Sequence, residues 1–381
     1  MYRVLIVSVA NFIDSTAEVP YLYKKAGCSV HVFCHKSSWL LSNKYFDRWI
    51  DAGDEENEPV FLNNFLELIK TQPNYYDKIV ITDDATNKLL NDAIEDPVLF
   101  KKVLPLTKIE NRNLLSSKAG FSAVLEKYQI ATPKYITYHE GINLETIKKE
   151  FNFPILLKVD YSFSGIGLKM VEKPEDLSTS IEEIHDNLNL VLQEFIQGED
   201  IGVEALFHEG KLIMYNCATI NGYMYNRFSF TTGRTYYRDE RIEKLLTELG
   251  EKIGLNGFAS IQYVYCNDKD IFYLIEVDVR TNSWLPYGRF TGYNFSDGIR
   301  SIFDPTGNHK LLTKPKPKNT KVNVYIFDRD IRRCVKNRDY NGLLKWVTNH
   351  DGRWKYIPLY DWKLFRRIVS KIIYDFKQKI I

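Results

Sequence analysis

Residues 261–282 read Ile-Gln-Tyr-Val-Tyr-Cys-Asn-Asp-Lys-Asp-Ile-Phe-Tyr-Leu-Ile-Glu-Val-Asp-Val-Arg-Thr-Asn. An apolar run from Ile271 leads into Glu276, Asp278 and Arg280, which alternate with two valines. Because successive side chains of a strand point to opposite faces, the three charged side chains share one face. Gln262 precedes them by one short hairpin, and the facing strand can carry its amide toward the same carboxylates. These oxygens suit Mg²⁺, and the adjacent arginine suits phosphate.

The Glu-x-Asp-x-Arg pattern by itself is more typical of a salt-bridged sheet edge. The strand over residues 153–159 favours the other interpretation, because it places Lys158 between Leu157 and Val159. A buried lysine needs a counter-charge. The small-residue loop that follows, within residues 160–171, has backbone amides able to close over phosphates. Lys118 alone is more typical of a solvated helix start.

The composition is that of an ordinary globular protein. The chain has 381 residues, 44% hydrophobic and 26% charged, with a net charge of +2. This length predicts two or three structural units, and the charge gives no indication of nucleic-acid binding. Five cysteines without CxxC spacing indicate reduced thiols, and no apolar run spans a bilayer. We therefore expect a cytoplasmic protein.

The first unit, residues 1–105, has the pattern of a small parallel α/β domain. Strands are predicted at Val4–Val9, Val30–Cys34 and Lys78–Thr82, with helices near Tyr21–Ala26 and Asn63–Thr71. No Gly-x-Gly-x-x-Gly follows the first strand, which argues against dinucleotide binding. Asp83 and Asp84 lie at the carboxyl end of the third strand, where ligands bind in such sheets. A helix N-cap before Ala85–Ala93 is the favoured interpretation.

Three further units follow along the chain. Residues 106–190 form a small α+β unit with the phosphate-covering loop, and residues 191–312 form a larger unit built on an antiparallel sheet. The Pro/Lys-rich segment 313–318 indicates a linker. Beyond it, residues 319–381 are expected to hold the strand Lys321–Phe327 and the helices Tyr340–Asn349 and Trp362–Lys379.

Taken in order, the motifs of this chain resemble the ATP-grasp superfamily, most nearly its carbamoyl-phosphate-synthase-like and biotin-carboxylase-like branches. The motifs are Lys118, Lys158, the Ser162–Lys169 loop, Gln193–Asp200, Gln262 and Glu276–Arg280. The resemblance covers about residues 1–300. It implies a mixed α/β fold, in which a pre-ATP-grasp domain precedes two α+β subdomains that clasp ATP.

The resemblance also implies roles for single residues. Lys118 and Lys158 contact the nucleotide phosphates, and Ser164, Gly165, Gly167 and Lys169 belong to the loop that covers them. Glu194, Phe195 and Ile196 read the adenine edge. Asp200 stands where the family commonly has a ribose-binding Glu, and the neighbouring Glu199 is the alternative. Gln262, Glu276 and Asp278 hold Mg²⁺, or Mn²⁺ in its place, although Asp278 is commonly Asn. Arg280 lies beside the transferred phosphoryl group.

ATP-grasp enzymes typically convert a carboxylate to an acylphosphate before a nucleophile attacks. We therefore expect a carboxylate–amine ligase that acts on small molecules, with Arg280, Lys158 and Arg234 as catalytic residues. Arg227 and Arg234 lie on a predicted polar loop that suits an acid clamp. Arg289, Gly292 and Asn294 are expected to shape the acceptor pocket. Two alternatives stay open: biotin-carboxylase-like bicarbonate activation, and a nucleotide-binding regulatory module without turnover.

The final segment, residues 362–381, is a basic amphipathic helix. Its apolar stripe consists of Leu364, Phe365, Ile368, Ile372 and Phe376. One interpretation is a peripheral membrane contact. Packing on the protein body or on a dimer partner is favoured.

Overall fold

The computed structural model describes residues 1–12, 14–54, 57–139, 141–162, 167–184, 189–304, 306, 312 and 321–378. The N-terminal part is a parallel sheet of order β3-β2-β1-β4. Its strands are β1 (Arg3–Ser8), β2 (Ser29–Cys34), β3 (Arg48–Asp51) and β4 (Lys78–Ile81). Its helices are α1 (Val19–Lys25), α2 (Glu58–Thr71), α3 (Asp84–Ala93) and α4 (Pro97–Val103), with 3-10 turns η1 (Asp14–Thr16), η2 (Trp39–Ser42) and η3 (Ile109–Leu115). The predicted parallel unit is confirmed, with β3 and α4 added to it.

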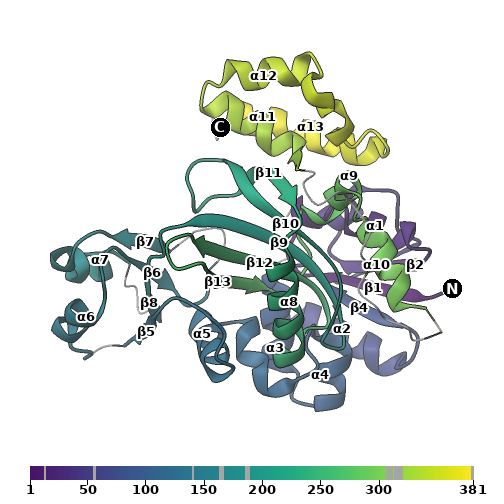
Figure 1. Cartoon of the computed structure of the whole chain (residues 1–381). Helices are drawn as coiled ribbons and strands as arrows, with labels where there is room; N and C mark the ends of the chain where they lie inside the picture. The colour runs from purple at the N-terminus through teal and green to yellow at the C-terminus, as the bar shows by residue number, and fades with distance from the viewer. Residues whose placement is uncertain are drawn as a thin grey trace.

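A second sheet projects from the body at the left of Figure 1. It is antiparallel, of order β5-β8-β6-β7. Its strands are β5 (Tyr135–Tyr138), β6 (Ile155–Val159), β7 (Leu168–Val171) and β8 (Leu190–Glu194), and its helices are α6 (Leu144–Glu150), α7 (Leu177–Ile184) and the turn η4 (Pro174–Asp176). Leu157, Leu177 and Leu192 are fully buried in a core of its own. This sheet therefore forms a lobe separate from the main core.

The central sheet has six strands in the order β13-β12-β9-β10-β11-β14. They are β9 (Glu199–His208), β10 (Lys211–Tyr223), β11 (Thr231–Tyr237), β12 (Gly257–Cys266), β13 (Ile271–Asp278) and β14 (Val322–Tyr325). Helix α8 (Glu240–Ile253) covers it with Ile242, Leu246 and Ile253, which share one helix face. The helix ends at Gly254, whose φ of +82° is a left-handed conformation that glycine adopts without strain.

One hydrophobic core joins the central sheet to the N-terminal domain. Phe61 and Phe65 of α2 belong to the same buried cluster as Phe207 of β9 and Leu246 of α8. Helix α5 (Lys118–Lys127) adds Leu125 to this cluster and not to the core of the projecting lobe. The short helices α9 (Gly288–Thr291) and α10 (Phe295–Ile302), with the turn η5 (Leu285–Tyr287), follow β13. The site-bearing strands are thus fixed rigidly against the N-terminal sheet.

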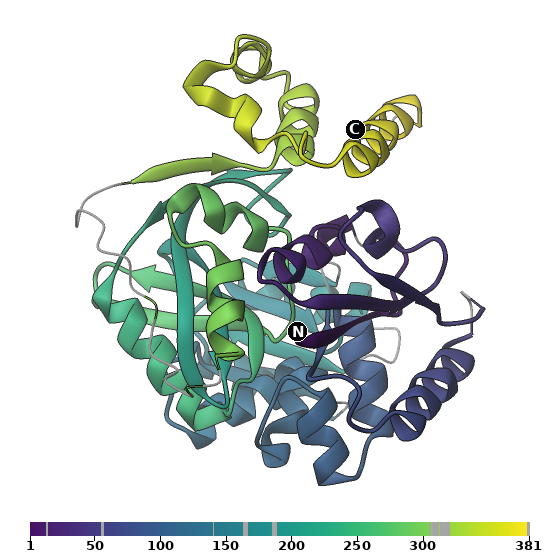
Figure 2. The same cartoon turned by 90° about the vertical axis from the view of Figure 1, so that its right-hand side faces the viewer.

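The C-terminal unit sits over the edge of the central sheet (Figure 2). It contains β14, α11 (Phe327–Lys336), α12 (Tyr340–Val347), η6 (His350–Tyr356) and α13 (Trp362–Lys377). The sequence predicted a strand that continued to Phe327, whereas β14 ends at Tyr325 and a helix begins two residues later. Because β14 pairs antiparallel with β11, the extension is part of the central sheet. The predicted linker 313–318 lies outside the described residues.

Helix α13 packs against the N-terminal domain, as the favoured interpretation predicted. Leu364 is fully buried with Trp39 and Ala17, and Ile368 packs on this cluster. Arg367 donates hydrogen bonds to the backbone carbonyls of residues 37 and 38 and lies over the Trp39 ring. Phe376 stays exposed near the end of the helix. None of the helices in the described ranges is both long and apolar enough to cross a membrane.

Candidate active site

A cavity of about 730 Å³ lies where the three sheets and the C-terminal unit meet. This volume is typical of small-molecule sites. Most of the residues singled out from the sequence line it: Lys118, Lys158, Glu194, Phe195, Ile196, Asp200, Arg227, Arg234, Gln262, Glu276, Asp278 and Arg280. The carboxyl ends of β1 and β4 also contribute, through Ala10 and Thr82. Open α/β sheets bind their ligands at this edge.

The hairpin β12–β13 brings the predicted metal ligands together. Gln262 stands directly opposite Glu276 in the antiparallel register, and Ser260 stands opposite Asp278. Glu276 and Asp278 are two residues apart on β13, so their side chains share the face toward the cavity. Within the described ranges, the Glu276 carboxylate has no ion pair. Its oxygens are therefore free for a ligand.

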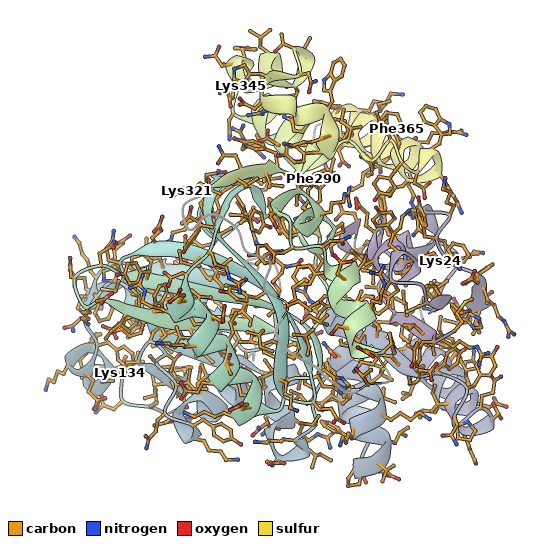
Figure 3. The ribbon with its side chains drawn as sticks, turned by 45° about the vertical axis from the view of Figure 1, so that its right-hand side comes forward. Lys24, Lys134, Phe290, Lys321, Lys345 and Phe365 are labelled. Atoms are coloured by element: carbon orange, nitrogen blue, oxygen red, sulfur yellow. The ribbon has the colours of Figure 1, made fainter. Side chains whose placement is uncertain are left out.

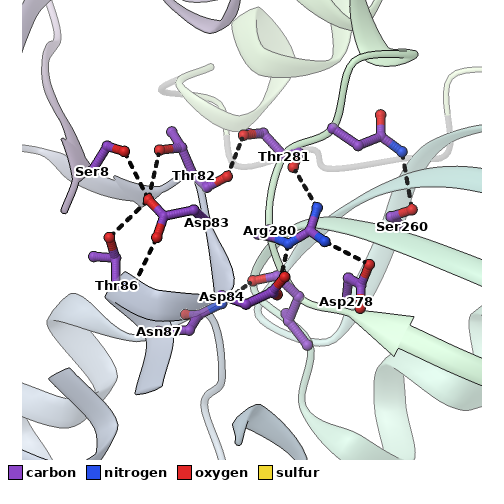
Figure 4. Close-up of polar contacts among 12 residues, drawn as sticks. Ser8, Thr82, Asp83, Asp84, Thr86, Asn87, Ser260, Asp278, Arg280 and Thr281 are labelled. Carbon is purple, nitrogen blue, oxygen red and sulfur yellow. Dashed lines mark hydrogen bonds and ion pairs between the residues drawn. The ribbon is translucent and has the colours of Figure 1, made fainter. Parts of the chain in front are cut away.

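Arg280 is held between two carboxylates (Figure 4). Its Nε donates to Asp84 Oδ1 at 2.6 Å and its Nη2 to Asp278 Oδ2 at 2.9 Å. Burial lowers the pKa of Arg280, but Asp278 and Asp84 more than offset that effect and raise it. The guanidinium therefore stays charged at any physiological pH. Its third contact, to the carbonyl of Thr281, fixes its plane.

The two aspartates after β4 have different roles. Asp83 accepts from the backbone N–H of Thr86 and from the Ser8 hydroxyl, so it is the predicted N-cap of α3. Asp84 faces the cavity and pairs with Arg280. The sequence interpretation treated both as part of one cap and missed this pairing. The signal was present in the position of Asp84 at the carboxyl end of a parallel strand.

The two predicted phosphate lysines reach the cavity from different elements. Lys158 on β6 is buried and donates to Gln193 Oε1 at 2.6 Å. Burial lowers the pKa of Lys158 to about 8, although Glu276 acts in the opposite direction. Lys118, at the start of α5, donates to the backbone carbonyl and hydroxyl of Ser162 at 3.0 Å. Burial lowers its pKa as well, against the effect of Glu276 and Asp160.

The loop after β6 is described only at its two ends. Ser162 lines the cavity, and Gly167 adopts a φ of +68° beside Val159. Ser164 and Gly165 lie outside the described residues. Lys169 belongs to β7 rather than to the loop, and its ammonium contacts Glu183 of α7. The structure therefore gives Lys169 a partner outside the cavity, contrary to the expectation that it covers the phosphates.

The residues predicted to bind adenine and ribose differ in whether their side chains already have partners within the protein. Glu194, Phe195 and Ile196 line the cavity at the end of β8. Asp200 also lines it, but its carboxylate accepts from Arg227 at 2.6 and 2.7 Å and from the Tyr223 hydroxyl at 2.5 Å.

Glu199, the alternative ribose ligand, is exposed and does not line this cavity. The alternation of β9 explains the separation, because neighbouring side chains point to opposite faces.

Arg234 is not on a polar loop, which corrects the sequence prediction. The loop ends at residue 230, and Arg234 lies in β11, buried, with its Nη1 2.5 Å from Glu204 Oε1. Its guanidinium lies over the Trp284 ring, 4.4 Å from the centroid. Gly202 leaves room for it, since a Cβ there would come within 2.8 Å of the guanidinium carbon. Arg234 is thus compensated within the protein and is not a free acid clamp.

The residues expected to shape the acceptor pocket do not line this cavity. Arg289 pairs with Glu18 and lies over Phe290, which is labelled in Figure 3. Gly292 is the left-handed C-cap of α9, and Asn294 caps α10 by accepting from the Ser296 N–H. The cavity wall that the sequence missed comes from Phe12, Asp14, Arg329, Arg332 and Lys371. No motif marked these residues, because their proximity depends on the tertiary packing of the C-terminal unit.

The oxygen donors on β12 and β13 fit a hard divalent cation in part. Gln262, Glu276 and Asp278 offer an amide and two carboxylates, but one Asp278 oxygen is engaged by Arg280. The described residues contain no group of three or more His, Cys, Asp or Glu side chains placed to hold a metal. Mg²⁺ commonly takes one or two carboxylates and completes its shell with phosphate and water. The donor set fits Mg²⁺ bound together with a nucleotide.

Comparisons with known proteins agree with this geometry. Residues 115–283 match the family model described as an ATP-grasp domain. A carbamoyl phosphate synthase large chain of Pyrococcus furiosus is 24% identical over 215 residues, covering 54% of this chain and 19% of that protein. A D-alanine–D-alanine ligase of Acinetobacter baumannii is 20% identical over 218 residues, covering 52% and 70%. This chain thus aligns with only about a fifth of the length of that carbamoyl phosphate synthase relative.

Solved structures resemble the fold over most of the chain. An N5-carboxyaminoimidazole synthetase of Staphylococcus aureus, complexed with ADP, matches with a TM-score of 0.64 at 12% identity, covering 85% of this chain and 82% of that one. An L-amino acid ligase of Bacillus licheniformis matches with a TM-score of 0.59 at 15% identity, covering 86% and 80%. Residues 115–283 are therefore an ATP-grasp domain, set in a chain that has the ATP-grasp fold.

Proposed function

We propose that this protein is an ATP- and Mg²⁺-dependent ligase that forms a C–N bond between a small carboxylate and an amine. ATP phosphorylates the carboxylate to an acylphosphate and leaves as ADP; the amine then displaces phosphate. The observation that carries this proposal is the convergence of Lys118, Lys158, Glu276, Asp278 and Arg280 on one cavity. Phosphoryl transfer depends mainly on positioning and on neutralising charge, and these are the side chains it requires.

Each group has a place in this reaction. Lys158 and Lys118 neutralise the nucleotide phosphates, and the backbone around Glu194–Ile196 receives the adenine. Gln262, Glu276 and Asp278 would hold Mg²⁺, which supplies charge neutralisation at the transferred phosphoryl group. Arg280 is fixed by Asp84 and Asp278 and stabilises the negative charge that develops on the equatorial oxygens.

The names of the relatives favour amino acids as the first substrates to test. One curated relative is a D-alanine–D-alanine ligase, and one structural neighbour is an L-amino acid ligase. A biotin carboxylase of Campylobacter jejuni also shares the fold, with a TM-score of 0.59, so bicarbonate belongs in the same screen. We place the protein in the cytoplasm, because ATP is abundant there and all five cysteines are free thiols.

The test is product analysis. Purified protein is incubated with ATP, Mg²⁺ and pools of amino acids, other carboxylic acids, amines and bicarbonate. We expect ADP and phosphate to be released only with certain pools. Glu276→Ala should lower this rate by at least about 100-fold, since it removes a metal ligand from the transition state.

Glu251→Ala is the matched control, because Glu251 is an exposed carboxylate of α8 outside the cavity. Its rate should equal that of the unmodified protein. AMP and pyrophosphate as products would contradict an acylphosphate mechanism. ADP release that needs no added acid or amine would indicate an ATPase instead.

A further inference from the structure

The C-terminal unit supplies a basic wall to the cavity that also holds the nucleotide-binding residues. Arg329 and Arg332 of α11 and Lys371 of α13 line this cavity together with Lys118 and Glu276. They arrive there because β14 extends the central sheet and α13 docks on Trp39. The proposed phosphoryl-transfer chemistry uses none of these three cations.

Two carboxylates outside the large cavity form ion pairs with Arg332 and Lys371. Asp375 is buried and lies 3.3 Å from Arg332 Nη1 and 3.2 Å from Lys371 Nζ. Asp328 lies 2.5 Å from Arg332 Nη2. Neither aspartate lines the large cavity. Asp375 and Asp328 therefore pair with these cations from outside the large cavity, whereas Asp14, which pairs with Arg329 and Arg332, lines it. On this side of the cavity three cations lie beside one carboxylate.

Arg329 is compensated least. It is buried, yet in the described part of the chain its one ionic contact is with Asp14, at 3.4 Å. Its guanidinium also lies over the Phe230 ring, 5.0 Å from the centroid. A guanidinium has five N–H donors in a planar fork that matches a carboxylate or phosphate. An oxyanion bound in the cavity would give this guanidinium an acceptor in addition to Asp14.

Two exposed aromatic side chains also line the cavity. Phe12 and Phe230 both line the cavity, and they are 69% and 49% exposed. Exposed aromatic side chains at the mouth of a cavity are typical of ligand contact surfaces. They suit the carbon skeleton of a small organic anion better than a free inorganic ion.

We propose that Arg329 and Lys371 bind a side-chain oxyanion of the second substrate, a carboxylate or phosphate that does not itself react. This inference rests on the proposed function and adds a substrate class to it. The C-terminal unit then selects substrates that carry an additional negative charge. Arg332 pairs with three carboxylates, so it holds α11 and α13 in place and does not bind the ligand itself.

The test compares matched pairs of ligands on the full chain, saturated with Mg²⁺ and the non-hydrolysable analogue AMP-PNP. L-Aspartate is compared with L-alanine, and O-phospho-L-serine with L-serine, by titration calorimetry. The pair with the larger preference identifies the carboxylate or the phosphate. The preferred anion should bind at least about tenfold more tightly than its neutral partner, as expected for one charge-assisted contact.

Arg329→Gln and Lys371→Gln should each remove most of this preference and leave the affinity for AMP-PNP within about twofold. Lys371 is partly exposed, so its variant is expected to fold even if the Arg329 variant does not. Lys345→Gln is the control: Lys345 is exposed on α12 in the C-terminal unit (Figure 3). It does not line the cavity, so its loss should change nothing.

The two proposals fail in different ways. Equal binding of the charged and neutral members in both pairs, or a preference that survives both variants, would overturn the anion wall. The ligase could still stand in that case. Failure of AMP-PNP to bind with Mg²⁺ would instead contradict the proposed function. The same ligand pairs, titrated without nucleotide, would still test whether Arg329 and Lys371 bind an oxyanion.

Discussion

The projecting lobe and the central sheet each place one buried cation at the cavity, but the protein compensates the two charges differently. Lys158 on β6 meets the neutral amide of Gln193, and burial lowers its pKa to about 8. Arg234 on β11 meets the Glu204 carboxylate; although burial lowers its pKa, this carboxylate raises it overall. A buried charge without a counter-charge is costly. Lys158 therefore marks where a ligand's negative charge is missing, whereas Arg234 belongs to the framework.

The strongest test of this contrast is Glu204→Gln, which leaves the Arg234 guanidinium buried without its counter-charge. We expect the free energy of unfolding to fall by about 3–5 kcal/mol, the usual effect of breaking a buried pair. Glu204 is only 1% exposed and also accepts from Asn282 and Tyr236, so little water can replace the carboxylate. Urea denaturation of the nucleotide-free protein measures the change.

Glu145→Gln is the matched control for that substitution. It breaks the solvent-exposed pair between Glu145 and Lys148 and should change stability far less than Glu204→Gln does. If Glu204→Gln were as mild as this control, Arg234 would be solvated from the cavity. It would then become available as the acid clamp that the sequence predicted.

Lys158→Met should show the opposite pattern. The substitution removes a buried charge that forms no ion pair within the described residues, so the stability of the nucleotide-free protein should stay equal or rise. The affinity for MgATP should fall by about 10- to 100-fold, because a charge-assisted contact is worth about 1.5–3 kcal/mol. Thermal melting and nucleotide titration measure the two effects. A large loss of stability would mean that Lys158 belongs to the framework of the lobe, as Arg234 belongs to that of the central sheet.

The pH dependence of nucleotide binding sharpens the same point. With a pKa of about 8, Lys158 loses its proton in the free protein as the pH rises through that value. Nucleotide affinity should therefore fall above about pH 8, by up to about tenfold per pH unit, and Lys158→Met should flatten this profile.

Folding stability should change in the opposite direction in the same window. The folded pKa of Lys158 lies below its ordinary value of 10.5, so between about pH 8 and 10.5 the unfolded chain binds more protons. This group therefore adds stability as the pH rises. Denaturation of the parent protein and of Lys158→Met at several pH values isolates the contribution, and a parallel pair of profiles would contradict it.

Much of the fold and half of the site could be predicted because the information is local. The alternation of Glu276, Asp278 and Arg280 fixes their shared face, and the short hairpin fixes Gln262 opposite Glu276. Lys158 was recognisable because a lysine inside an apolar strand has few structural explanations. These inferences needed only the period of a strand and the cost of burying charge.

The missed features depend on contacts distant in sequence. Arg234 follows a polar stretch, and its buried partner Glu204 lies 30 residues earlier, so no local pattern shows that Arg234 is buried and paired. Arg280 and Asp84 are 196 residues apart, so no local pattern could show their ion pair. The basic wall of α11 and α13 depends on how the C-terminal unit docks, which its amphipathic pattern alone does not specify.

The smallest expected effect comes from Asp200→Asn, and it decides between the sequence prediction and the contacts seen in the structure. If Asp200 serves mainly to hold Arg227 and the loop over residues 224–230, MgATP affinity should change by less than about threefold, or about 0.6 kcal/mol. Arg227→Gln should then have a similar effect, because it breaks the same pair. A loss above tenfold with Asp200→Asn alone would show that nucleotide binding frees this carboxylate from Arg227. Asp200 would then be the ribose ligand that its position in the motif predicts, and the contacts in the free protein would be those of a resting state.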